Sequence, residues 1–252
     1  MDGTKMKMLC GMAVVAVMSA GSAMAATLNL TFTGLGPAKV VGANYNNNRT
    51  WSAGSVNSFS NYWAGEMQWK NAQGATFSTF CTQVNEHIHY NQNVTYQQVA
   101  LEQVPDSPPA PGPMGALKAT VLRDLYARFY HDVKSSGDAT KNSAFQTLVW
   151  EITHENVNAQ TVAGVLAQLS LATGAFQLSN SGNSNLSVFN AANSMLADLG
   201  GADNNDYRGF NGMLGLRHDT AQDQILIVPI PIPALLAGVG LIGLGVLRRR
   251  MK

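Results

Sequence analysis

Cys81 and Gln146 are the residues whose types could do chemistry together in this chain. Cys81 ends the segment Phe77-Ser78-Thr79-Phe80-Cys81, and Gln146 lies within Ala144-Phe145-Gln146-Thr147-Leu148-Val149-Trp150. A cysteine thiol can displace ammonia from a glutamine carboxamide, which leaves an internal thioester: a reactive acyl group that carries no charge. Because such a ring closes through space, the long separation in sequence is no obstacle if the fold brings the two side chains together.

Trp150 follows Gln146 by one helical turn, so on a helix both side chains project from the same face. The indole would then shield the bond from water, with Phe80 and Phe145 as apolar support beside the reacting residues. A simpler interpretation stays open for the pair. Cysteine is often a small buried apolar side chain, and glutamine is usually an exposed helix residue.

Two other kinds of chemistry have weaker support in the sequence. A cysteine hydrolase built on Cys81 with His87 or His154 would need an orienting third group that the sequence does not show. His87 and His89 are predicted to share one face of a strand, but two histidines without a fixed third ligand are a weak metal signal. We therefore expect no enzyme activity, no metal and no cofactor.

The first 25 residues have the pattern of a secretory signal peptide. Lys5 and Lys7 precede an uncharged apolar run, and Ala23-Met24-Ala25 offers a small-residue cleavage site. Cleavage after Ala25 removes Cys10 and leaves Cys81 as the last cysteine. A lone cysteine in an oxidising compartment is expected to be buried, paired with another chain or already chemically occupied.

The C-terminal 25 residues look like a sorting signal. Val228, Pro229, Pro231 and Pro233 precede a Leu/Gly/Ala-rich segment that is long enough, with its flanks, to cross a bilayer, and Arg248, Arg249 and Arg250 follow it. This order resembles the PEP-CTERM class of sorting tails. The resemblance implies an exosortase-type sorting enzyme as partner, a transient inner-membrane anchor, and delivery to the cell surface or extracellular matrix of a Gram-negative bacterium.

Residues 26–227 form the predicted folded domain between these ends. Of the 16 Lys and Arg, six lie in the terminal segments, and of the 15 Asp and Glu only one does, so the domain carries a net charge of −4. No basic stripe is present, which gives nucleic-acid binding no support.

Hydrophobic periodicity predicts an α+β domain. Strands are expected over 28–32, 63–69, 75–84, 94–98 and 222–228, with a Gly/Asn-rich turn region over 34–48. A proline cluster at 105–113 ends the strand pattern, and a helical block follows over about 114–199. Its helices are predicted at 117–133, at 145–152 with Asn142 or Ser143 as N-cap, at 162–169 and at 188–199.

Residues 60–155 resemble bacterial thioester domains, which are surface adhesin modules. The resemblance rests on Phe80-Cys81, the helix over 121–129 and Gln146-x-x-Val149-Trp150-Glu151. The family's glutamine motif usually reads Thr-Gln-x-Ala-Ile-Trp, and here Phe145 stands in place of Thr and Leu148 in place of Ala. The resemblance implies a β-sandwich-like sheet domain with a helical subdomain, and a Cys81–Gln146 thioester that captures a surface amine.

A non-covalent role is the alternative. The same fold without a thioester would suit a structural component of an exopolysaccharide or biofilm matrix, with matrix polysaccharide as the partner.

Overall fold

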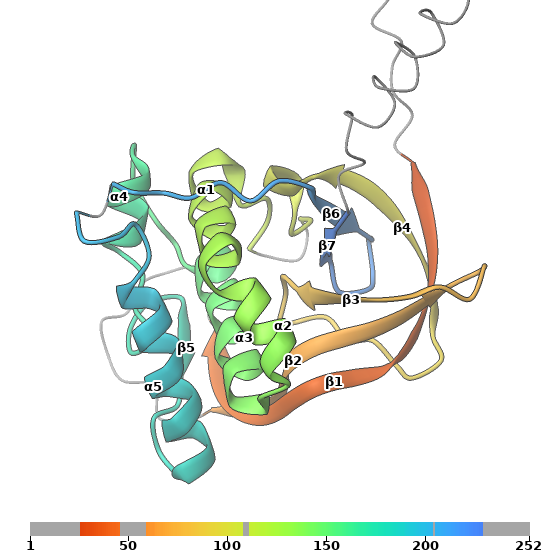
Figure 1. Ribbon diagram of the computed structural model, residues 1–252, viewed down its shortest axis with the longest axis horizontal. Coiled ribbons are helices and arrows are strands. Elements are labelled where there is room, and N and C mark those ends of the chain that lie inside the picture. Colours follow the sequence, from red (N-terminus) through yellow and green to blue (C-terminus); the bar gives the residue numbers. More distant parts are fainter. Residues whose placement is uncertain (1–25, 46–58, 108–110, 204, 229–252) are drawn as a thin grey trace, which may run out of the picture.

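The computed structural model describes residues 26–45, 59–107, 111–203 and 205–228. It has a mixed α+β fold in which most of the strands lie on one side and the helices on the other (Figure 1). Its strands are β1 (Thr27–Tyr45), β2 (Ser60–Asn71), β3 (Thr76–Cys81), β4 (Asn93–Ala100), β5 (Phe176–Leu178), β6 (Met213–Arg217) and β7 (Gln224–Ile227). Its helices are α1 (Gly115–Leu125), α2 (His131–Ser136), α3 (Ala139–His154), α4 (Val162–Leu166) and α5 (Asn183–Ala197), with a 3₁₀ turn over Leu101–Gln103 and a π turn over Tyr126–Tyr130.

The predicted chain ends lie outside these residues. The signal peptide over 1–25 and all of the sorting signal except Val228 belong to the parts that are not described. Within the described ranges, no helix has both the length and the apolar character that a membrane crossing requires.

The seven described strands form one antiparallel sheet in the order β2-β3-β7-β6-β4-β1-β5. Strand β1 is 19 residues long and also pairs with β2, so the strand pairings close into a circuit. The first residues of β1 pair with β4, its middle with β2, and its last residues with β5. A single long strand thus joins both ends of the sheet.

The predicted turn region over 34–48 is wrong for the part that the structure describes, because β1 continues to Tyr45. The glycines of this region instead allow bulges where β1 pairs with β2. The register with β2 shifts between Phe32 and Gly34 and again between Leu35 and Ala38, and Gly34 has a φ of 134°. Such bulges bend a strand without ending it, and glycine accommodates the backbone there.

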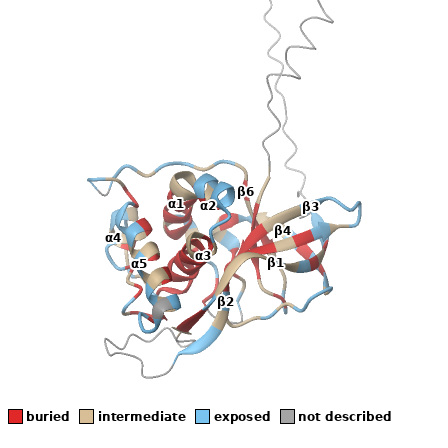
Figure 2. Ribbon diagram, turned by 60° about the horizontal axis from the view of Figure 1, so that its bottom comes forward, coloured by how far each residue is buried: buried red, intermediate tan, exposed pale blue. Residues whose placement is uncertain are grey.

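Helix α3 is the centre of the helical side and is buried along most of its length (Figure 2). Asp138 caps its N-terminus by accepting hydrogen bonds from the backbone N–H groups of Thr140 and Lys141 at 2.6 and 3.3 Å. The predicted N-caps, Asn142 and Ser143, are wrong, since both lie inside the helix. Ser143 docks α3 on the sheet, because its Oγ donates to Ala64 O at 2.8 Å.

The other predicted helices are present with shifted bounds. The helix predicted over 117–133 is α1, the π turn and α2 in direct succession, whereas α4 is shorter than predicted and α5 begins earlier. Strands β5 and β6 are absent from the prediction because β5 has only three residues and the apolar residues of β6 do not alternate with polar ones. One cluster of buried side chains runs from the sheet into the helices, with Trp69, Phe80, Phe145 and Trp150 among its largest members.

Candidate functional site

Cys81 and Gln146 meet where the sheet contacts α3. Cys81 is the last residue of β3, and Gln146 lies in the second turn of α3. The side chains are 4% and 0% exposed. Their positions follow from two fixed elements: β3 pairs with β2 and β7, and Ser143 holds the start of α3 against β2.

The Gln146 carboxamide is hydrogen-bonded to the main chain of Cys81 through both its oxygen and its nitrogen. Cys81 N donates to Oε1 at 3.1 Å, and Nε2 donates to Cys81 O at 2.7 Å. The β2–β3 ladder ends at the Met67–Thr79 pair, so β2 provides no partner for Cys81. The carboxamide therefore takes the place of a strand neighbour and lies directly against the residue whose thiol it would acylate.

Burial raises the pKa of the Cys81 thiol to about 12. The indole N–H of Trp150 works against this increase. Its contact with sulfur falls short of a full hydrogen bond, since Nε1 is buried without a partner of normal geometry among the described residues. At neutral pH the thiol is protonated, which is the wrong state for a hydrolase nucleophile.

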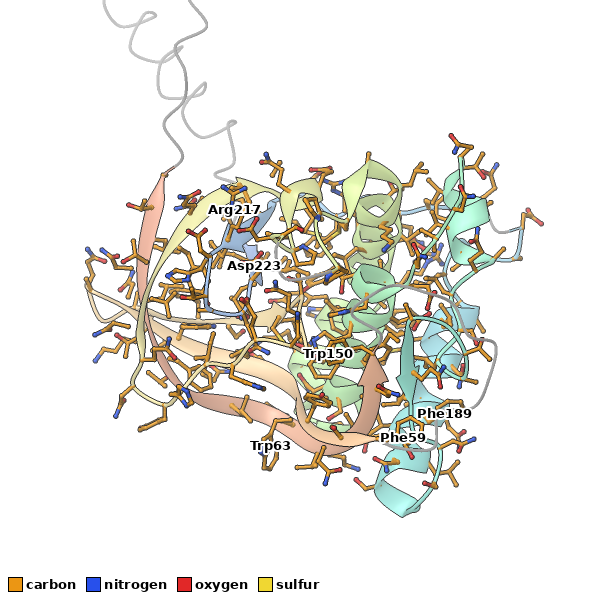
Figure 3. The ribbon with its side chains drawn as sticks, turned by 180° about the vertical axis from the view of Figure 1, so that it is seen from behind. Phe59, Trp63, Trp150, Phe189, Arg217 and Asp223 are labelled. Atoms are coloured by element: carbon orange, nitrogen blue, oxygen red, sulfur yellow. The ribbon has the colours of Figure 1, made fainter. Side chains whose placement is uncertain are left out.

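A cavity of about 320 Å³ leads from Cys81 and Trp150 to the surface. Trp63, which is 62% exposed, lies at its outer side. Trp150 lies between the sheet and the helices, whereas Trp63 lies at the margin of β2 (Figure 3). The cavity is lined by Phe32, Leu35, Asn61, Tyr62, Trp63, Gly65, Met67, Cys81, Val84, His87, Ile88, Trp150 and Gln222.

Gly65 of β2 lines the cavity at a point where β2 lies very close to β1, and only glycine fits there. Its φ is 154°, and a Cβ there would lie 2.5 Å from Pro37 O and 2.6 Å from the Ala38 Cβ. Any larger residue would force β2 away from β1. The close approach of these strands shapes the wall beside Cys81.

Phe80 and Phe145, the chain neighbours of Cys81 and Gln146, are buried and do not line the cavity. Their ring centroids are 4.8 Å apart, and Tyr126 packs against Phe145 at 4.9 Å. Trp150 instead packs near Tyr62 and Phe176, at 6.5 and 6.2 Å. Of the three predicted supporting residues, Trp150 alone borders the cavity.

Comparison with protein-family profiles, curated proteins and solved structures gave no match to this chain. The chemistry of the site is therefore argued from its own geometry.

Asp223 holds the chain beyond Cys81 and was not singled out by the sequence. Its main chain accepts from Thr82 N at 2.9 Å and donates to Gln83 Oε1 at 2.7 Å. Its carboxylate accepts from the backbone N–H groups of His218 and Asp106 at 2.7 and 2.6 Å. Burial raises its pKa to about 7 against the effect of these bonds. The one available signal was a charged residue in the otherwise uncharged predicted strand over 222–228.

The histidines lie differently from the prediction. His87 and His89 do not share a strand face, because the segment between β3 and β4 is irregular. His87 lines the cavity with Cys81, while His154 Nε2 accepts from Val84 N at 3.2 Å. In the described part of the chain, no three His, Cys, Asp or Glu side chains gather in a way that could hold a metal ion.

Proposed function

We propose that this chain is an exported, non-enzymatic attachment protein in which Cys81 and Gln146 form an internal thioester. The observation that carries this proposal is the contact of the Gln146 carboxamide with the main chain of Cys81, across 65 residues of sequence. A second support is the cavity, which would give an outside nucleophile a path to the bond. Burial of both side chains would keep water from hydrolysing it.

The groups present are suited to closing the ring. The Cys81 sulfur attacks the carboxamide carbon of Gln146, the C–N bond breaks, and the thiol proton leaves with Nε2 as ammonia. Cys81 N–H, which donates to Oε1 at 3.1 Å, lies where negative charge develops on that oxygen. Cys81 O accepts from Nε2 and thereby orients the leaving group. An incoming amine would later form an amide at Gln146 and release the thiol.

The remaining parts of the proposal concern the domain and its delivery. We propose a sandwich-like arrangement of the sheet, export through residues 1–25, and sorting through residues 228–252 to the cell surface or extracellular matrix of a Gram-negative bacterium. Val228 is the described start of that tail, and its N–H donates to Gly212 O at 2.7 Å. The tail would therefore leave the domain directly after β7, where a sorting enzyme can reach it.

A structural matrix component without the bond is the second candidate. It is favoured by the two hydrogen bonds of Gln146, which satisfy the carboxamide as it stands, and by the raised pKa of Cys81, which keeps the thiol protonated. In that case the pair serves only to join β3 to α3.

Thiol labelling of the unfolded protein separates the two candidates. With a thioester, Cys81 in the exported wild-type protein resists an alkylating reagent until methylamine has opened the bond. Gln146→Leu labels at once, and Cys81→Ala provides the background. Equal labelling of wild type and Gln146→Leu without methylamine would contradict the thioester and leave the structural role.

A further inference from the structure

A second cavity, of about 420 Å³, lies between the π turn over Tyr126–Tyr130 and the C-terminal end of α5. The loop that follows α5 completes its wall. None of its lining residues belongs to the cavity beside Cys81, and neither candidate function uses it. Short π turns within helices are frequent at functional sites, and the volume is in the range of small-ligand sites.

Arg128 is a hydrogen-bond donor that is held in place in this wall. Its side chain is 9% exposed, and Nε donates to the two carboxylate oxygens of Asp124 at 2.8 and 2.9 Å. Nη2 donates to Asp206 O. Nη1 has no hydrogen-bond partner in the part of the chain that the structure describes. Because the guanidinium is already fixed, little side-chain entropy is lost when Nη1 donates to a ligand.

Asp124 also fixes the loop that completes the cavity. Its carboxylate is fully buried and accepts from Gly200 N at 2.8 Å and from Arg208 N at 2.7 Å. Gly201 has a φ of 67°, and a Cβ there would lie 3.0 Å from the Asp206 Cβ. Glycine therefore allows the tight path of the loop at this point, and the cavity is formed before a ligand binds.

The charges around this cavity are mixed. Arg128 is paired with Asp124, and Arg208 Nε lies 3.9 Å from Asp206 Oδ2. Asp198 adds a third carboxylate where α5 ends, and the C-terminal end of a helix itself carries partial negative charge. An anion would be repelled by Asp198, and a cation would be repelled by the two guanidinium groups. The ligand that fits is neutral and both donates and accepts hydrogen bonds.

The wall also offers one aromatic ring, that of Phe129, beside these polar groups. From this combination we infer that the cavity binds a neutral sugar ring. Its hydroxyl groups accept from Arg128 Nη1 and the Arg208 guanidinium and donate to the Asp198 carboxylate, while its C–H face packs on Phe129. The inference does not depend on the thioester. Under the second candidate function, it names the place where a matrix glycan is held.

The test is a heteronuclear NMR titration of the isotope-labelled exported protein. The probes are glucose, galactose and mannose, each compared with its uronate and its 2-amino sugar. At least one neutral sugar should shift the backbone amide signals of Phe129, Ala202 and Arg208 and leave those of Trp63 and Cys81 in place. Its uronate and its amino sugar should bind on the order of tenfold more weakly. The inference is overturned if no neutral sugar shifts these signals, or if a charged form binds as tightly.

Variants at two charged positions identify the cavity as the binding site. Arg208→Ala and Asp198→Ala should each weaken binding of the neutral sugar about tenfold, because each removes one charge-assisted hydrogen bond. Arg123→Ala and Asp203→Ala are matched controls that should bind as wild type does, since neither residue lines the cavity. Unchanged binding in both cavity variants overturns the inference. Cys81→Ala should bind the sugar normally, so loss of the thioester and loss of the sugar site are separate outcomes.

Discussion

Helix α3 carries two buried polar regions that differ in charge. In its second turn, the neutral Gln146 is bonded to the Cys81 main chain beside a cavity. At its C-terminal end, Glu151 and Glu155 form a charged region with Lys118 of α1, and none of the three lines that cavity. The neutral Gln146 thus lies beside the cavity, whereas the charged region lies away from the cavity.

The charged region is devoted to holding backbone. Lys118 Nζ donates to Thr153 O at 3.0 Å and Glu155 O at 2.5 Å, at the end of α3. The Glu155 carboxylate accepts from Ala175 N, and a Cβ on Gly174 would collide with it. Each of these bonds fixes the end of a helix or a loop, so the charged region has a structural role. The Gln146 region remains the candidate for chemistry.

The largest expected effect is the loss of Lys118. Lys118→Met leaves two carbonyl oxygens without their donor and removes the cation near Glu151. Breaking such a buried interaction costs about 3–5 kcal/mol of unfolding free energy. Urea unfolding measures it, with the exposed Lys70→Met as a control that should change stability by less than about 0.5 kcal/mol. A loss below about 1 kcal/mol for Lys118→Met would contradict the structural role.

Replacing Gln146 should lower the unfolding free energy by a smaller amount, measured in a variant that cannot form the thioester. In a Cys81→Ala background no thioester can form, and adding Gln146→Leu leaves the buried N–H and C=O of residue 81 without partners. We expect a loss of about 2–3 kcal/mol in urea unfolding. The exposed Gln73→Leu in the same background should be nearly neutral. A neutral Gln146→Leu would show that the carboxamide does not join β3 to α3.

Asp223 should make the stability of the Cys81 region depend on pH. Its folded-state pKa of about 7 exceeds the ordinary value of 3.8, so its stabilising contribution is complete below pH 4 and is lost as the pH rises through 7. At about 1.4 kcal/mol per pKa unit, wild type should lose up to about 4 kcal/mol of unfolding free energy relative to Asp223→Asn between pH 4 and pH 8. The exposed Asp219→Asn should follow wild type. Parallel curves for wild type and Asp223→Asn would contradict the raised pKa.

Glu151→Gln should have the smallest effect. Burial, together with the charge of Glu155, raises the pKa of Glu151 well above its ordinary value. This shift favours the neutral carboxyl, which glutamine closely imitates. Thermal and urea unfolding at pH 7 should change by less than about 1 kcal/mol. Glu155→Gln should cost more, because it turns an amide N–H toward Ala175 N–H or removes one acceptor. Equal losses in both variants would contradict this difference.

The sequence predicted elements where the pattern was long and regular. The four-residue repeat from Leu117 to Val133 is helical, and the strand predicted over 75–84 is present as β3, which ends at Cys81. The prediction was wrong in two places where residue composition did not reveal the backbone geometry. The glycines after Phe32 form bulges within β1 and not a turn. His87-Ile88-His89 is not a strand but precedes a turn in which Gln92 N donates to His89 O. Alternation over three residues cannot tell a strand from such a turn.

The site was only partly accessible from sequence. Cys81, Gln146 and Trp150 were identified by residue type and helical spacing. The cavity joins Tyr62 and Trp63 of β2 with His87 and Gln222 from two other segments, and no local spacing relates the three segments. Asp223 was missed for the same reason, since its partners Gln83 and Asp106 are more than 100 residues away in the chain.

The intact mass of the exported protein tests the central claim most directly. Its chain ends are first fixed by peptide mapping, and Gln146→Leu is measured beside it as a form that cannot close the ring. The thioester predicts a wild-type mass lower than its sequence by one ammonia, with the loss located to a linked pair of peptides that contain Cys81 and Gln146. A wild-type mass equal to that of the plain sequence, with both peptides separate, would contradict the claim.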